Sequence, residues 1–85
     1  MNNTQKINNS LSAQQLRLIE YLRENKQIST IEARQKLEIM HPAGRIKELR
    51  EHHNIKTHWT KQQGHLIANY VLLSSHDNVS GGDNA

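Results

Sequence analysis

The chain has 85 residues, a formal net charge of +3 and no cysteine. A chain of this length holds one domain at most, and the lack of cysteine excludes a disulfide scaffold, Cys-ligated zinc and a thiol nucleophile. No apolar run approaches the roughly 20 residues that span a bilayer, and the polar start of the chain lacks the apolar core of a signal peptide. The sequence therefore predicts a soluble cytoplasmic protein without a membrane partner. Its excess of basic residues is consistent with a polyanionic partner.

The apolar residues are concentrated in the middle of the chain. Of the 29 hydrophobic residues, 25 lie between positions 11 and 73. The flanking segments are polar and contain Asn and Gly, a composition typical of disorder. We therefore predict a disordered tail over residues 1–10, a folded domain over residues 11–74 and a disordered tail over residues 75–85. The folded domain carries ten basic and six acidic residues, so it is more basic than the whole chain.

The first predicted helix covers residues 13–25. Ser12 and Gln15 have the spacing of a capping box, and Leu11 and Leu16 have that of a hydrophobic staple. Apolar residues then recur at helical spacing, which predicts a buried stripe of Leu16, Ile19 and Leu22, widened by Leu18 and Tyr21.

A short strand and a second helix follow. Residues 26–28 are too few for a helix, but they could form a strand that pairs with a later hairpin. Ser29 and Glu32 have the spacing of another capping box, which predicts a helix over residues 30–37. Its short apolar pattern consists of Ile31, Ala33 and Leu37.

The third predicted helix covers residues 42–52. His41 can cap this helix, and Pro42 suits the first helical turn, where its missing N–H costs nothing. The apolar spacing predicts a buried stripe of Ala43, Ile46 and Leu49, with Gly44, Lys47, Glu48 and Glu51 pointing outward. Arg45 and Arg50 flank the stripe, and Arg50 is expected to anchor the end of the helix or to pair with an acidic residue rather than to touch a partner.

The pattern then changes to the alternation of a β-hairpin. Alternating residues predict a strand over 55–60, residues 61–65 form a polar turn that contains Gly64, and residues 66–73 form a second strand. Trp59 and Tyr70 are predicted to be core residues that pack on the third helix.

The order of these elements is that of a helix-turn-helix followed by a wing. The fold class is therefore mainly α with a small β-hairpin (α+β): a winged helix-turn-helix with three helices and a two- or three-stranded wing. The sequence also resembles a family of small winged helix-turn-helix proteins common in phages and prophages. The residues that carry the resemblance are Thr30-Ile31-Glu32-Ala33-Arg34, Ile39-Met40-His41-Pro42-Ala43, Arg45-Ile46, Glu48-Leu49-Arg50 and Asn54-Ile55-Lys56-Thr57-His58-Trp59.

The resemblance covers residues 11–73 and implies a winged helix that binds DNA as a phage-type regulator. Two positions depart from the family pattern. Gly44 stands where an alanine-like helix former is usual, and His52-His53 replaces a step that usually ends in glycine. We therefore expect His53 or Asn54 to adopt the left-handed backbone of the turn before the wing.

DNA binding requires cations for phosphates and polar groups for base edges. Residues 34–61 carry seven basic and three acidic residues. Arg45 could bind guanine bidentately, and Glu48 could accept a hydrogen bond from cytosine. The residues expected to face the major groove are His41, Gly44, Arg45, Lys47 and Glu48. The expected backbone and minor-groove contacts are Lys36 near the helix-turn-helix junction and Lys61, Gln62, Gln63 and His65 at the wing.

Other chemistry has little support in the sequence. His52 and His53 could be combined with His58 or His41 in a zinc site, but adjacent histidines on a helix point to different sides and no His-Glu-x-x-His motif is present. No catalytic triad, phosphate-binding glycine loop or carboxylate pair is present either. The sequence predicts no metal, no cofactor and no enzymatic activity.

Two functions remain after this elimination. The first is binding of double-stranded DNA in transcription regulation or an excision-like DNA transaction. The second is a winged-helix protein-interaction module, such as a small phage inhibitor of host machinery, which the acidic residues Glu48 and Glu51 favour. A homodimer, or a complex with a host or phage protein, stays open in either case.

Overall fold

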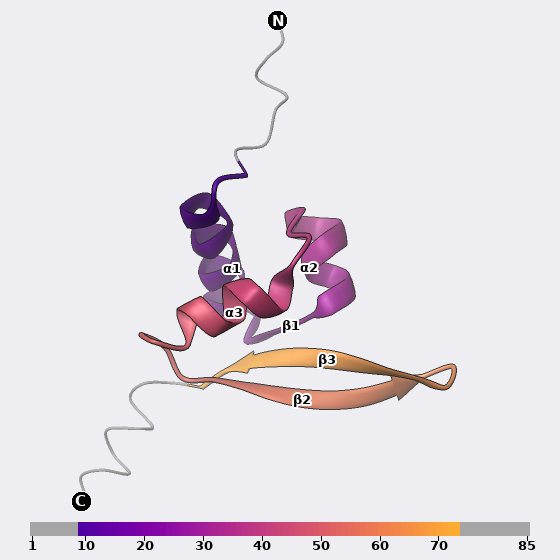
Figure 1. Ribbon diagram of the computed structural model, residues 1–85. Coiled ribbons are helices and arrows are strands. Elements are labelled where there is room, and N and C mark those ends of the chain that lie inside the picture. Colours follow the sequence, from indigo (N-terminus) through magenta and orange to yellow (C-terminus); the bar gives the residue numbers. More distant parts are fainter. Residues whose placement is uncertain (1–8, 74–85) are drawn as a thin grey trace, which may run out of the picture.

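Three helices and a three-stranded antiparallel sheet make up the computed structural model, which describes residues 9–73 (Figure 1). The predicted α+β winged helix-turn-helix class is confirmed, with the three-stranded form of the wing. The predicted tails over residues 1–10 and 75–85 lie outside the described residues, except for Asn9 and Ser10. The elements in chain order are α1 (Leu11–Asn25), β1 (Gln27–Ser29), α2 (Thr30–Leu37), α3 (Pro42–Leu49), β2 (Ile55–Gln62) and β3 (His65–Leu72).

Helix α1 begins two residues earlier than predicted. Ser10 is the N-cap, and its side chain accepts a hydrogen bond from the Ala13 N–H at 3.2 Å, so the predicted capping box of Ser12 with Gln15 is wrong. The predicted staple is wrong for the same reason, because Leu11 lies inside the helix and is exposed. Leu16 is 55% exposed and leaves the predicted stripe. The buried residues of α1 are Gln14, Leu18, Ile19 and Leu22.

Helix α2 begins at the predicted capping box. The Glu32 N–H donates to Ser29 Oγ at 3.0 Å, and the Ser29 N–H donates to Glu32 Oε1 at 3.0 Å. These reciprocal bonds satisfy two of the donors that a helix start leaves unpaired. The hydrogen bond from the Ser29 backbone lowers the pKa of Glu32, with help from Lys36. The predicted bounds of this helix and its cap are confirmed.

Helix α3 is shorter than predicted and ends at Leu49 instead of residue 52. Pro42 occupies the first turn as predicted, but His41 makes no side-chain capping hydrogen bond. The buried residues are Pro42, Ile46 and Leu49, whereas Ala43 is exposed. The proline ring therefore takes the core position that the sequence assigned to Ala43.

The connection from α3 to β2 is held by Arg50. Its Nε donates to the Ile55 carbonyl at 2.8 Å and its Nη2 donates to Thr57 Oγ1 at 2.6 Å, which confirms the predicted anchoring role. The backbone N–H groups of His52 and His53 donate to the Leu49 carbonyl at 3.0 and 2.9 Å. Because these bonds close the turn, neither His53 nor Asn54 needs the left-handed backbone, and the expectation for them was wrong.

The hairpin is longer and its turn tighter than predicted. Strands β2 and β3 pair from Ile55 with Leu72 to Gln62 with His65. Only Gln63 and Gly64 form the turn, and both have positive φ angles (50° and 81°), as a type I′ turn requires. Lys61, Gln62 and His65 belong to the strands, so the predicted five-residue turn is corrected. Strand β1 pairs with β3, one residue later in the chain than predicted, and the sheet order is β1-β3-β2.

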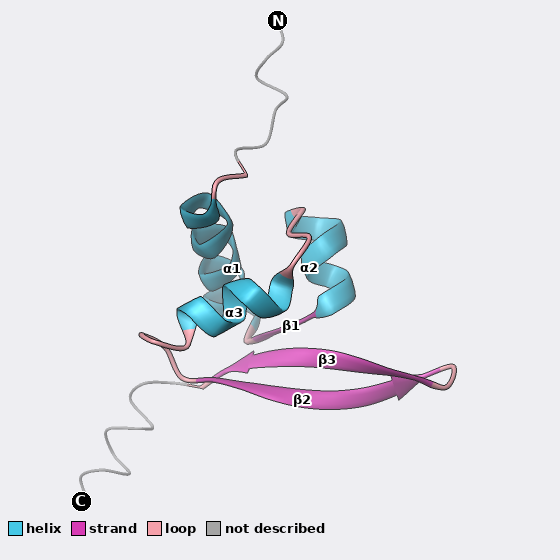
Figure 2. Ribbon diagram, viewed as in Figure 1, coloured by secondary structure: helices cyan, strands magenta, loops and turns pink. Residues whose placement is uncertain are grey.

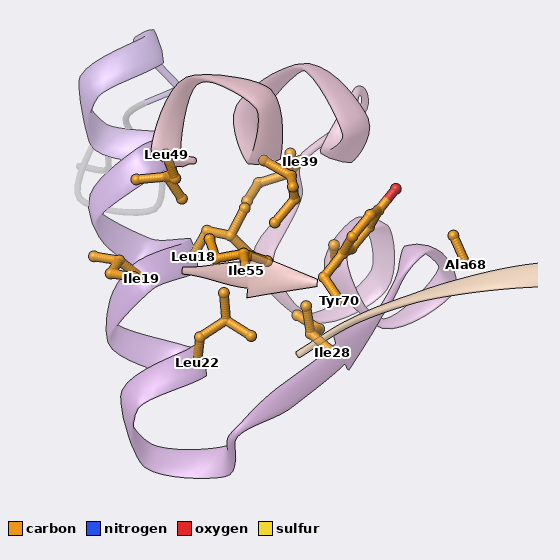
Figure 3. Packing of buried hydrophobic residues seen from close by; sticks show 11 residues of the cluster. Leu18, Ile19, Leu22, Ile28, Ile39, Leu49, Ile55, Ala68 and Tyr70 are labelled. Carbon is orange, nitrogen blue, oxygen red and sulfur yellow. The ribbon is translucent and has the colours of Figure 1, made fainter. Parts of the chain in front are cut away.

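The core lies between the helices and the base of the sheet. Leu18 and Leu22 of α1, Ile28 of β1 and Ile46 of α3 are almost completely buried and meet Tyr70 of β3 in one cluster (Figure 3). The prediction that Tyr70 is a core residue is confirmed by its 5% exposure. Trp59 is 59% exposed, so its prediction as a core residue is wrong. The reason is visible in Figure 1, where the hairpin extends beyond the helices that could cover it.

Candidate nucleic-acid interface

Helix α3 lies between the other two helices and the hairpin (Figure 2), so only part of its circumference is available to a partner. Ile46 and Leu49 face the core. The exposed positions Ala43 and Lys47 are four residues apart and therefore share one face of the helix. His41, just before the helix, is also exposed, and Gly44 is half-buried. A Cβ at Gly44 would meet nothing within 4 Å, so packing within the chain does not require a glycine there.

Arg45 and Glu48 pair with each other on α3, and the Glu48 side chain is 37% exposed. Arg45 Nε and Nη2 donate to Glu48 Oε1 and Oε2 at 2.8 and 2.9 Å, and the arginine side chain is only 13% exposed. Gln15 Nε2 of α1 donates to Glu48 Oε1 at 2.8 Å, and Arg45 Nη1 lies 3.5 Å from Gln14 Oε1. The two predicted base contacts thus form the α1–α3 junction, defined here as Gln14, Gln15, Arg45 and Glu48.

The pairing of Arg45 with Glu48 follows from the local geometry of the helix. Residues three apart on a helix are neighbours, and Arg with Glu at that spacing can form a bidentate pair. The Arg45 guanidinium, followed by the Gln15 amide, holds the pKa of Glu48 below its ordinary value. The Arg-x-x-Glu spacing was a sequence signal for this pair. The Gln15 contact joins residues 33 positions apart, so only the fold reveals it.

The predicted wing contacts lie together at the far end of the hairpin. Lys61, Gln62, Gln63 and His65 are all exposed. They surround the type I′ turn, which Figure 1 shows at the outer end of β2 and β3. The hairpin therefore presents a polar, basic tip that is separate from the core. Together with His41 and Lys47, this tip is the part of the predicted interface that the fold leaves open near α3 and the wing.

Lys36 is exposed but lies on the opposite side of α2, beside α1. Its ammonium is 3.4 Å from Glu32 Oε2, 3.5 Å from the Tyr21 hydroxyl and 5.9 Å from the centre of the Tyr21 ring. The contact with Tyr21, followed by that with Glu32, raises the pKa of Lys36. The fold therefore does not bring Lys36 together with the exposed side of α3 and the wing.

A groove that the sequence did not predict opens between the helix-turn-helix and the wing. Its volume is about 610 Å³. One side is formed by Thr30, Ile31 and Arg34 of α2 and by residues 41–44 at the start of α3, and the other by the hairpin residues Trp59, Leu66, Ile67, Ala68 and Tyr70. The missed signal was that Trp59 and Leu66 share one face of the hairpin near its tip, and recognising it requires knowing how far the helices extend.

Over residues 9–73, no three side chains of the His, Cys, Asp and Glu types gather where they could hold a metal ion. Within the same part of the chain, no helix has the length and apolarity needed to cross a bilayer.

Comparison with known proteins identifies the family. The model of a winged helix-turn-helix domain family matches residues 13–75, which is most of the chain. Neither the curated proteins nor the solved structures gave a match. The family match covers α1 to β3, the same elements that form the helix-turn-helix and the wing, and such domains are in general DNA-binding modules. The chain belongs to the winged helix-turn-helix domain family.

Proposed function

We propose that this protein binds double-stranded DNA, with α3 in the major groove and the hairpin as a wing. It acts in transcription regulation or a related DNA transaction such as excision, as a phage or prophage protein in the cytoplasm of a bacterial cell. The single observation that carries the proposal is the position of Lys47 and of the tip residues Lys61, Gln62, Gln63 and His65. All are exposed, and they come from the two elements that a winged helix applies to DNA.

The exposed face of α3 suits close contact with a duplex. His41, Gly44 and Lys47 are the proposed groove-facing residues of this helix. Packing within the chain does not require a glycine at position 44. The absence of a Cβ there leaves room for a partner to approach the backbone. Lys47 supplies a cation for phosphate or a donor for a base edge.

Arg45 and Glu48 have a positioning role in this proposal. Their ion pair and the Gln15 contact tie α3 to α1, which sets the angle at which α3 projects. The pairing also answers an electrostatic objection, since the negative charge of Glu48 is balanced by a guanidinium at 2.8 Å. Glu51 is exposed and retains its repulsion of phosphate. Lys36 is also proposed to contact a phosphate.

A salt titration tests the proposal. The affinity for a nonspecific labelled duplex, measured by fluorescence anisotropy, should fall steeply with salt, because each neutralised phosphate releases condensed counterions. Lys47→Ala and Lys61→Ala should each lower the slope of log affinity against log salt by about 1. The control is Lys26→Gln, which removes an exposed ammonium from the far end of α1 and should leave the slope unchanged. Absence of binding at low salt would contradict the proposal.

The second candidate function is a protein-interaction module, such as an inhibitor of host machinery. The exposed apolar side chains of Trp59 and Leu66 favour it, because large exposed apolar patches often mark protein contacts. The salt titration separates the two functions, since a protein partner predicts no affinity for a nonspecific duplex. Sedimentation of the protein alone and with duplex tests for a homodimer under either function.

A further inference from the structure

One face of the hairpin continues from the core into solvent. Side chains of directly paired residues lie on the same face of an antiparallel sheet, as do residues two positions apart on one strand. Tyr70, Ala68 and Leu66 of β3 therefore share a face with Trp59, which pairs with Ala68. Tyr70 and Ala68 are buried, whereas Trp59 and Leu66 are 59% and 65% exposed. The apolar face thus extends beyond the point where the helices cover it.

This exposed part of the face forms one wall of the groove described above. The opposite wall comes from the starts of α2 and α3, and includes Ile31, Arg34 and His41. Arg34 Nε donates to the Met40 carbonyl at 3.3 Å, which holds the guanidinium beside the α2–α3 connection. Figure 1 shows the hairpin tip projecting past α2 on this side of the molecule. The groove therefore has one apolar wall and one wall that carries the Arg34 guanidinium and the His41 imidazole among apolar residues.

The position of the groove matches one part of a bound duplex. If α3 enters the major groove and the wing reaches the adjacent minor groove, one sugar–phosphate strand separates the two and must pass between α3 and the hairpin. The groove lies at that place. A DNA strand presents anionic phosphates and the apolar carbon surface of deoxyribose, and the two walls offer the complementary chemistry.

We propose that this groove seats the DNA strand that lies between the major groove and the minor groove, an inference that rests on the proposed DNA-binding function. Trp59 and Leu66 pack against deoxyribose rings, and Arg34 and His41 contact the flanking phosphates. The wing then contributes apolar contact along its helix-facing side in addition to polar contact at its tip. An apolar segment of a partner protein is the competing occupant.

The first experiment uses the intrinsic fluorescence of the protein. Trp59 is the single tryptophan of the chain, so all tryptophan emission reports on this groove. On titration with duplex, we expect the emission maximum to shift to shorter wavelength and acrylamide quenching to fall, both saturating together with the anisotropy of the labelled duplex. If anisotropy shows salt-dependent binding while quenching stays unchanged, the groove assignment is overturned and the DNA-binding function stands. If anisotropy shows no binding, both fail.

The second experiment compares matched apolar substitutions. Trp59→Ala should weaken duplex binding by about tenfold, since an indole covered on binding contributes apolar burial of that order. Leu66→Ala should weaken it severalfold, and Trp59→Phe should retain most of the affinity. The matched control is Leu16→Ala, a leucine of similar exposure on α1 outside the groove, which should leave the affinity unchanged.

The folded state of each variant is checked by circular dichroism and thermal unfolding. Little change is expected, because Trp59, Leu66 and Leu16 are all exposed. If Trp59→Ala and Leu66→Ala bind duplex as tightly as the parent protein, the DNA strand does not occupy the groove. The proposal is then overturned in favour of a protein partner there.

Discussion

The two halves of the hairpin have the same backbone pattern but opposite environments. The base, residues 55–58 with 69–72, places Ile55 and Tyr70 under the helices, where both are buried. The outer half, residues 59–62 with 65–68, places Trp59 and Leu66 in solvent on the same face. Strand pairing continues without interruption from one half to the other. The difference therefore arises from where the helices end and not from the strands.

The two halves of the hairpin have different roles. In the base, an aromatic side chain fills the core, and Arg50 joins the strand to α3. In the outer half, an aromatic side chain of similar size is largely exposed and lines an open groove. Residues in the base should therefore control stability, and residues in the outer half should control binding. Substitutions that affect only one half can test this separation.

The largest expected effect is the contrast between the two aromatic residues. Tyr70→Ala should lower the free energy of unfolding by about 3–5 kcal/mol, because it leaves a cavity in the core. Trp59→Ala should lower it by less than about 1 kcal/mol, as expected for a surface substitution. Urea unfolding followed by circular dichroism measures both. Similar losses for the two variants would show that the outer half also supports the fold.

The local signals of the sequence were sufficient wherever a residue interacts with its near neighbours. Ser29 with Glu32 marked the start of α2, and Pro42 marked the first turn of α3. Tyr70 is a core residue of the largely apolar second strand of the hairpin, as predicted. The winged helix-turn-helix class could be predicted from the order of such elements, because each helix or strand carries its own periodicity.

Two placements that sequence reasoning missed have a different physical origin, since they depend on contacts between distant segments. Arg45 appeared to be an outward-facing cation, but Glu48 and residues of α1 hold it at the α1–α3 junction. Trp59 appeared to be a core residue because alternation gives the face of a strand but not the reach of the helices. The start of α1 was missed because Ser10 and Ser12 are both acceptable caps, and the choice between them is a local competition.

The second prediction concerns the link between the base of the hairpin and α3. Arg50→Ala should lower the free energy of unfolding by about 1–2 kcal/mol, because the carbonyl of buried Ile55 loses its charged donor. Arg50→Lys should recover only part of the loss, since lysine cannot donate to Ile55 and Thr57 through one planar group. Lys56→Ala, on the exposed side of the same strand, is the matched control in urea unfolding. An Arg50→Ala variant with an unchanged free energy of unfolding would contradict the anchoring role.

The third prediction concerns the turn at the hairpin tip. Gly64→Ala should lower the free energy of unfolding by about 1 kcal/mol, because its φ angle of 81° is unfavourable for a residue with a Cβ, although space for one is available. Gln63→Asn should raise stability by a few tenths of a kcal/mol, because asparagine tolerates the positive φ of 50° better. Thermal unfolding compares the two. A loss of stability for Gly64→Ala together with a gain for Gln63→Asn is expected if the type I′ turn is present in solution. A gain for Gly64→Ala or a loss for Gln63→Asn would contradict that turn.

The smallest effect is a pH dependence at the connection between α3 and the base of the hairpin. Burial, followed by the charges of Arg23 and His52, lowers the pKa of His53 below its ordinary value of 6.5. The unfolded chain then binds this proton more readily than the folded one, so the contribution is fully present above pH 6.5 and is lost as the pH falls through 6.5 towards the lowered pKa. Urea unfolding at pH 7.5 and pH 5.5 should show a loss of stability that His53→Gln reduces. His52→Gln, at the exposed neighbouring position, should retain most of that loss. If His53→Gln left the pH dependence unchanged, protonation of another group would have to cause it.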